Sequence, residues 1–106
     1  MVFGAFHPWP PAWVALHEQQ VVGFLTSRVV SAGPTIAPPT AAIDDVWVAP
    51  PWRGQGAGRQ LVEAWRGAAR AGGAEAFEVS TLAADADAVG FWRAMGFGDY
   101  RLRLRC

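Results

Sequence analysis

The sequence predicts an α+β domain of the three-layer α/β type, with a mixed, mostly antiparallel sheet, a central strand–helix–strand crossover and flanking helices. Three observations predict it. Before residue 31, a short, weakly alternating segment and a segment rich in β-branched residues are joined by a short polar turn, as in a hairpin. An apolar segment, a glycine-rich turn and a helical pattern follow one another at Val46–Val62. A second helical segment leads into the strictly alternating Tyr100–Arg105.

The first half of the chain carries mainly strand signals. Proline removes a backbone donor and breaks helices, so the proline-rich start cannot be helical. Short alternating or β-branched segments bounded by polar or proline-rich stretches are predicted strands. In order, we expect an extended lead-in at residues 1–12, strands at Trp13–Leu16 and Val21–Val30, a loop at Ser31–Thr40 and a strand at Ala41–Ala49.

The second half alternates helix and strand. Asp85 is a predicted N-cap, because a short carboxylate accepts from free amides at a helix start. A strand, a helix and a strand in succession indicate a parallel pair with a right-handed crossover. In order, we expect a helix from about Gly56 to Ala71, a strand at Ala76–Leu82, a helix from Asp85 through Met95 and a strand at Tyr100–Arg105.

Length and composition restrict the class of protein. With 106 residues the chain is predicted to be one domain, 1–106. The formal net charge is zero, whereas a nucleic-acid binder would carry a basic stripe. Cys106 is the lone cysteine, so we expect neither a disulfide framework nor a metal cluster. No segment is apolar enough for a signal peptide or membrane span, and we expect a cytoplasmic protein.

The glycine-rich turn is predicted to bind an anion. Its glycines leave main-chain amides bare, and the first turn of the following helix adds unpaired N–H groups. A phosphate loop of the Walker type would need a lysine after Gly58, and the sequence contains no lysine. A dinucleotide fingerprint would need GxGxxG, whereas the spacing here is GxGxG. A turn that merely connects a strand to a helix is the remaining alternative.

The sequence contains two motifs about forty residues apart. The first, Val48-x-Pro50-x-x-Arg53-x-x-Gly56-x-Gly58, resembles the pyrophosphate loop of the GNAT superfamily of acyl-CoA-dependent N-acyltransferases. The second is Asp85-x-x-Ala88-x-x-Phe91-Trp92-x-x-x-Gly96-Phe97, which has Asp and Trp where the family usually has Asn and Tyr. The resemblance extends from about Trp13 to the C-terminus and implies a GNAT-like fold.

The resemblance implies a coenzyme A site built largely from main chain. In the family the strand before the loop diverges from the next strand, and the pantetheine arm of the cofactor enters the gap. The pyrophosphate lies on the loop amides. The implied cofactor-binding residues are Trp47, Val48 and Ala49 for pantetheine, Arg53, Gly54, Gln55, Gly56, Ala57 and Gly58 for pyrophosphate, and Asp85 and Phe91 of the second motif.

The resemblance also implies catalytic candidates. Adjacent strand residues face opposite ways, so one of Asp44 and Asp45 should reach the cleft as a base; we favour Asp44 through a water. The alternative is an aspartate that only caps or pairs at a strand edge. Trp92 replaces the usual tyrosine acid, and its indole can donate a hydrogen bond but no proton at neutral pH. Trp92 then packs in the core or against the thioester, with water protonating the thiolate. Tyr100 could replace it only if it points to the same cleft.

The implied function is transfer of an acetyl group from acetyl-CoA to the primary amine of a small molecule, without a metal, nucleic acid or membrane. The alternative is a non-catalytic acyl-CoA-binding module or subunit. GNAT domains usually begin with a strand and two helices, whereas only about a dozen residues precede Trp13, too few for two helices. Either the acceptor site is open, or a partner chain completes it, or the chain is a fragment of something longer. We expect a homodimer.

Overall fold

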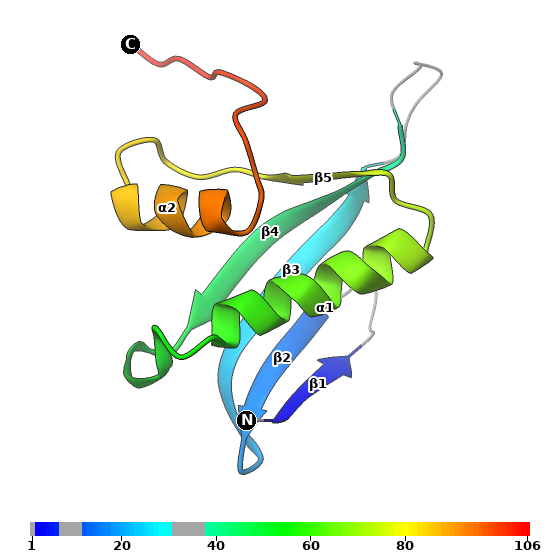
Figure 1. Ribbon diagram of the computed structural model, residues 1–106, viewed down its shortest axis with the longest axis vertical. Coiled ribbons are helices and arrows are strands. Elements are labelled where there is room, and N and C mark those ends of the chain that lie inside the picture. The colour runs from blue at the N-terminus through cyan, green and yellow to red at the C-terminus, as the bar shows by residue number, and fades with distance from the viewer. Residues whose placement is uncertain (1, 7–11, 31–37) are drawn as a thin grey trace.

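The computed structural model describes residues 2–6, 12–30 and 38–106 (Figure 1). Most of the described chain belongs to a sheet and two α-helices. The elements are, in order, β1 (Val2–Phe6), β2 (Ala12–His17), β3 (Gln20–Val30), β4 (Thr40–Val48), the 3₁₀ turn η1 (Pro50–Trp52), α1 (Ala57–Ala71), β5 (Ala76–Val79) and α2 (Ala86–Ala94).

The described strands form one five-stranded sheet in the order β1-β2-β3-β4-β5. Neighbours from β1 to β4 pair antiparallel, and β4 pairs parallel with β5. The hairpin between β2 and β3 turns at Glu18 and Gln19, which both have positive φ, as in the two-residue turns that match strand twist. The predicted α+β fold, hairpin and strand–helix–strand crossover are therefore confirmed.

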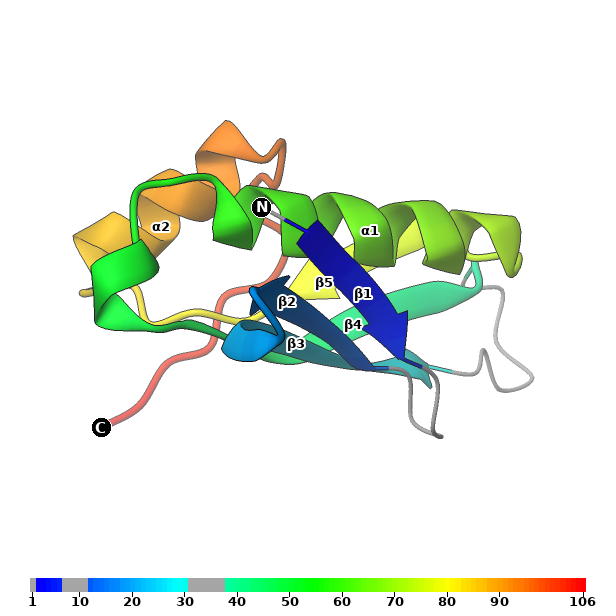
Figure 2. The ribbon, with the colours of Figure 1, turned by 90° about the horizontal axis from the view of Figure 1, so that it is seen from below.

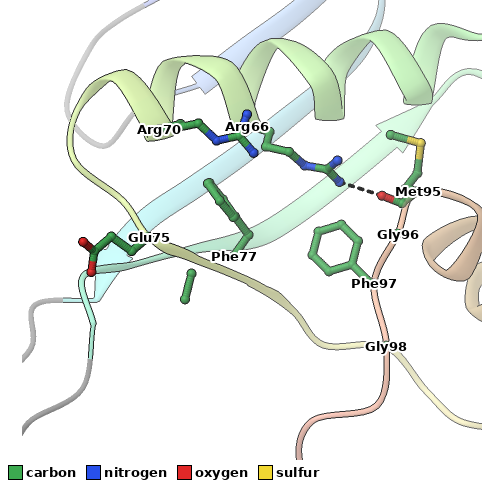
Figure 3. A pocket seen from close by; sticks show the side chains of 9 residues that line it. Arg66, Arg70, Glu75, Phe77, Met95, Gly96, Phe97 and Gly98 are labelled. Carbon is green, nitrogen blue, oxygen red and sulfur yellow. Dashed lines mark hydrogen bonds between the residues drawn. The ribbon is translucent and has the colours of Figure 1, made fainter.

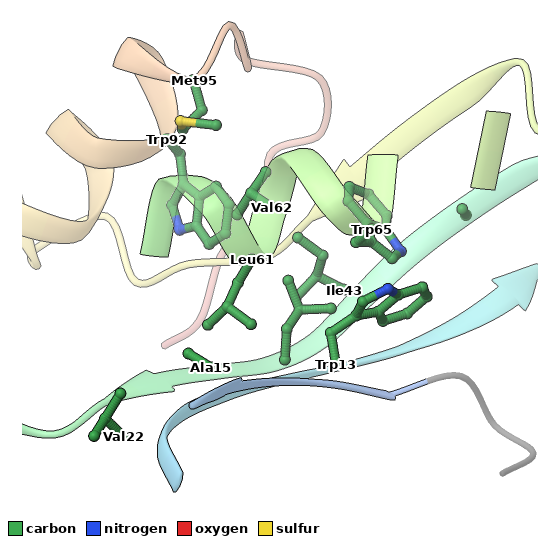
Figure 4. Packing of buried hydrophobic residues seen from close by; sticks show 11 residues of the cluster. Trp13, Ala15, Val22, Ile43, Leu61, Val62, Trp65, Trp92 and Met95 are labelled. Carbon is green, nitrogen blue, oxygen red and sulfur yellow. The ribbon is translucent and has the colours of Figure 1, made fainter. Parts of the chain in front are cut away.

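Helix α1 closes the core on one face of the sheet (Figure 4). Its Leu61, Val62 and Trp65 are at most 1% exposed. They pack on inward side chains of the sheet, among them Trp13 and Ile43. Full burial of one such aliphatic or aromatic side chain contributes about 1.5–3 kcal/mol. This burial holds the N-terminus of α1 beside the end of β4.

Both helices lie on the same side of the sheet (Figure 2). Trp92 and Met95 of α2 belong to the same buried cluster as Val62 of α1. The described chain thus supplies a helical layer and the sheet. We call the other side of the sheet the outer face; it carries the exposed rings of Phe24 and Trp47.

The start of the chain contributes more than a lead-in. Val2–Phe6 is extended, as expected, but it pairs antiparallel with β2, so the sheet begins at Val2 rather than near Trp13. The segment predicted as an extended lead-in therefore contains an edge strand, which the sequence pattern did not predict. Main-chain pairing of five residues is enough to add an edge strand. The rest of the lead-in, residues 7–11, and most of the predicted loop, residues 31–37, lie outside the described residues.

The end of the chain departs from the prediction. Tyr100–Arg105 forms no strand, although its alternation is strict, and Leu102 and Leu104 are exposed. A strand needs a partner for its main-chain groups, and this segment runs away from β5 (Figure 1). β5 is also shorter than predicted and ends at Val79 rather than Leu82.

None of the helices in the described part of the chain is long and apolar enough to cross a membrane.

Candidate active site

The site lies where β4 and β5 separate. Their parallel pairing runs only from Thr40–Ala76 to Ile43–Val79. β4 then continues to Val48, whereas the chain after Val79 turns toward α2. A cleft of about 250 Å³ opens at this point; it is lined by Ile43, Asp44, Asp45, Val46, Val79, Ser80, Thr81, Ala88 and Trp92.

A β-bulge interrupts the β3–β4 ladder at the cleft. Asp45 pairs with Thr26 and Ile43 pairs with Ser27, so Asp44 is an extra residue on β4. In a bulge two residues of one strand lie opposite one residue of the other, which changes the alternation of side chains. The two carboxylates therefore do not follow the geometry of a regular strand.

The bulge places both carboxylates on the outer face. Ile43 is buried in the core beneath α1, so the next residue, Asp44, faces outward. Trp47 stacks on Phe24 on the outer face, so Asp45, two residues earlier, faces outward as well. The prediction that the two aspartates face opposite ways is wrong, because it assumed unbroken alternation.

The two aspartates differ in their partners. The Arg28 guanidinium donates a short hydrogen bond to Oδ1 of Asp44 and forms an ion pair with it. Within the described residues Asp45 makes no ion pair. Arg28 was not predicted as a site residue, although it is the only charged residue of β3, which is a signal that could have found it.

Main-chain groups of Val48 face the gap between the strands. The Ala49 N–H donates to the Val22 carbonyl on β3 at 2.8 Å. Successive strand residues direct their N–H and C=O groups to opposite edges, so those of Val48 point away from β3. Nε of Arg53 donates to the Val48 carbonyl at 2.9 Å, which orders the loop against the strand end.

The glycine-rich turn leaves the start of α1 open. Gly54 and Gly56 have φ of 76° and 91°, a region that side chains disfavour. The Gln55 side chain donates to the Pro51 carbonyl at 3.0 Å. The Gly56 carbonyl accepts the first helical bond, from Gln60. The Arg53 amide donates to the Pro50 carbonyl at 3.3 Å, whereas the amides at the start of α1 precede the first intrahelical hydrogen bond. The first turn of α1 contains no acidic residue. The positive end of the helix dipole is thus not neutralised locally.

Helix α2 is positioned by the second motif. Asp85 caps it as predicted, with its carboxylate accepting from the Ala88 amide at 3.0 Å. A Cβ at Gly58 would lie 3.4 Å from two carbons of the Phe91 ring, which is van der Waals contact, so α2 packs on the start of α1 with room for little more than a methyl group. Of the two, Asp85 has a capping role and Phe91 a packing role here.

Trp92 lies both in the core and at the cleft. It is 7% exposed and makes edge contacts with Phe91 and Phe97, at centroid distances of 4.9 and 5.4 Å. It also lines the cleft with the two aspartates. Tyr100 does not join them: it is 77% exposed on the unpaired segment and is absent from the cleft lining.

A second pocket lies beyond the other edge of β5 (Figure 3). Arg66 donates to the Met95 carbonyl at 2.8 Å and lies over the Phe97 ring, while Arg70 lies over Phe77. These contacts connect α1 to the end of α2 and to β5. No group of three His, Cys, Asp or Glu side chains that could hold a metal ion occurs in the described ranges.

Comparison with known proteins identifies the family to which this chain is similar. The model of the acetyltransferase (GNAT) family matches residues 3–97. No curated protein sequence matches the chain.

Several solved structures share the fold. An aminoglycoside acetyltransferase from an uncultured soil metagenomic sample, in complex with sisomicin, has 28% identity and a TM-score of 0.79 over 91% of this chain and 64% of its own. A transcriptional regulator from Bacillus halodurans C-125 has 26% identity and a TM-score of 0.81 over the same shares. The aminoglycoside N-acetyltransferase AAC(6')-Iy in complex with CoA has 20% identity and a TM-score of 0.75, over 91% and 76%. This chain thus spans less than two thirds of the length of the first two proteins.

The contact between Gly58 and Phe91 predicts a position-specific loss of stability. Gly58→Val should lower the free energy of unfolding by about 1–3 kcal/mol, because the added methyl groups displace Phe91 and α2. Gly67→Val is the matched control, since Gly67 lies in the same helix with nothing within 4 Å of an added Cβ. Urea unfolding measures both. Equal effects of the two substitutions would contradict the packing role of Gly58.

Proposed function

The chain belongs to the GNAT acetyltransferase family, and we propose that it transfers an acetyl group from acetyl-CoA to the primary amine of a small molecule. The observation that carries the proposal is the cleft where β4 and β5 separate, with the open glycine-rich turn at the end of β4 and the two aspartates at the cleft. The relative in complex with CoA and the aminoglycoside acetyltransferase support the cofactor and the class of acceptor.

Coenzyme A would bind mainly through main chain. Its pyrophosphate fits the turn from Arg53 to Gly58, whose amides and helix dipole favour an anion. Its pantetheine arm fits along β4, where Val48 offers an N–H and a C=O to the gap. The Val48 carbonyl already accepts from Arg53, and its second lone pair remains for a pantetheine amide.

The reaction would be a direct attack of the neutral amine on the thioester. A carbon–nitrogen bond forms, the carbon–sulfur bond breaks, and coenzyme A leaves as a thiolate. One of the aspartates accepts a proton from the amine, water protonates the thiolate, and the Val48 N–H stabilises the oxyanion. Trp92 packs against the thioester and can donate an indole hydrogen bond to sulfur. Asp45 is the stronger candidate base, because Arg28 already holds Asp44.

A non-catalytic acyl-CoA-binding module is the second candidate. Trp92 favours it, since this residue stands where the family's usual acid is a tyrosine and offers no transferable proton. Turnover of acetyl-CoA with a panel of primary amines separates the two. Binding of acetyl-CoA without acetylation of any amine would favour the module.

The glycine-rich turn predicts that added negative charge abolishes cofactor binding. Gly56→Glu should weaken acetyl-CoA binding about tenfold or more, because a carboxylate then faces the pyrophosphate. Gly73→Glu is the matched control: this glycine also has positive φ and open surroundings, but it lies past the C-terminus of α1. Calorimetry measures both variants. No binding of acetyl-CoA to the unmodified protein at millimolar concentration would refute the function.

The two aspartates predict different effects on turnover. Asp45→Asn should lower kcat roughly 10²-fold and leave acetyl-CoA affinity unchanged, because the amide removes the base without altering size. Asp44→Asn should lower kcat less, because Asp44 is already paired with Arg28 and its loss removes an ion pair rather than the base. Steady-state kinetics measures both. A larger loss in Asp44→Asn would assign the base to Asp44, and unchanged turnover in both would assign proton removal to solvent.

A homodimer is a further part of the proposal. Several apolar side chains away from the cleft are exposed and offer surface for a second copy of the chain. They are Val29 and Val30 on β3 and Leu102 and Leu104 near the C-terminus. Sedimentation at low micromolar concentration should give twice the monomer mass. A single species of 11.4 kDa would exclude the dimer under those conditions.

A further inference from the structure

The outer face carries an aromatic pair next to the cleft. Phe24 of β3 lies opposite Trp47 of β4, with ring centroids 6.0 Å apart and planes inclined by 29°. The two residues are 36% and 44% exposed, and both helices lie on the other side of the sheet (Figure 2). Partly exposed, stacked rings offer a flat apolar surface on which another ring can lie.

This aromatic pair is continuous with the cleft. Asp45, which lines the cleft, precedes Trp47 by two residues on the same face, so their Cα atoms are about 6–7 Å apart. On β3, Thr26 lies opposite Asp45 and Phe24 lies opposite Trp47, so the two partners are also two residues apart. A carboxylate and two rings therefore form one surface, which begins at the candidate base.

The charge on this surface suits a single cation. Arg28 compensates the charge of Asp44, whereas Asp45 has no ion pair in the described part of the chain. Of the two aspartates at the cleft, only Asp45 is thus left uncompensated. The Arg28 side chain is 62% exposed on the same face and repels a second positive group nearby. A monoamine fits this arrangement better than a polyamine or an aminoglycoside does.

We propose that this surface binds the acceptor, and that the acceptor is a monoamine with an apolar ring two or three bonds from its nitrogen. Its ammonium group lies at Asp45, and its ring lies on Phe24 and Trp47. The inference rests on the proposed function, because it names the acceptor class of the same site. It explains why the strands leave an aromatic pair uncovered beside a carboxylate.

Binding of the amine alone tests the site without turnover. The probes are 2-phenylethylamine, butylamine and spermidine, titrated into the protein and followed by amide resonances in NMR. We expect 2-phenylethylamine to bind about tenfold more tightly than butylamine, because its ring is removed from water when it packs on the aromatic pair. Spermidine should bind no more tightly than butylamine. The shifted resonances should be those of residues 24–26 and 45–47.

A variant separates the ring contact from general charge. Phe24→Ala should remove the preference for 2-phenylethylamine and leave butylamine affinity unchanged. Val29→Ala, on the same strand and also exposed, is the control and should keep the preference. Tighter binding of spermidine, or a ring preference that survives Phe24→Ala, would overturn the inference.

Turnover with acetyl-CoA keeps the two proposals apart. If a ring-bearing amine binds with dependence on Phe24 but no amine is acetylated, the site stands and the activity fails. If amines are acetylated without preference for a ring, the activity stands and the acceptor class is wrong.

Discussion

The parallel ladder between β4 and β5 lasts four residue pairs, and the candidate site depends on where it stops. Had the two strands stayed paired to Val48, the main chain of β4 would be saturated and no ligand could pair with it. Because β5 ends at Val79, the second edge of β4 is free over its last residues. The loop and helix that follow β4 then lie at the mouth of the same gap. The short length of β5 is therefore what opens the candidate site.

A second constraint is the bulge at Asp44. It brings two adjacent carboxylates to one face, where a regular strand would have buried one of them under α1. Burial of an unpaired carboxylate in that core would cost several kcal/mol. On the outer face one aspartate instead pairs with Arg28, and the other remains available. The bulge thus reconciles a charged pair with a strand whose inner face packs in the core.

The site is formed more by main chain than by side chains. The open turn before α1 depends on the positive φ of Gly54 and Gly56, which side chains disfavour, and Val48 contributes to the site through its peptide groups. The helix can direct its amides at this place because Leu61, Val62 and Trp65 anchor it on the sheet. Stability of the core and geometry of the site are therefore linked through α1.

The sequence by itself determined the order and type of most elements. The β2–β3 hairpin, the crossover around α1 and the Asp85 cap follow from local signals, namely alternation, glycine position and a short carboxylate before a helix. The glycine-rich turn and the second motif also identified the family and the region of the cleft. Strand partnership was decided only by the tertiary structure. Val2–Phe6 pairs with β2, whereas Tyr100–Arg105, with its stricter alternation, pairs with nothing described, because a strand exists only where another strand accepts its hydrogen bonds. The shared face of Asp44 and Asp45 and the ion pair with Arg28 likewise depend on how β3 and β4 align, which no local pattern in either strand specifies.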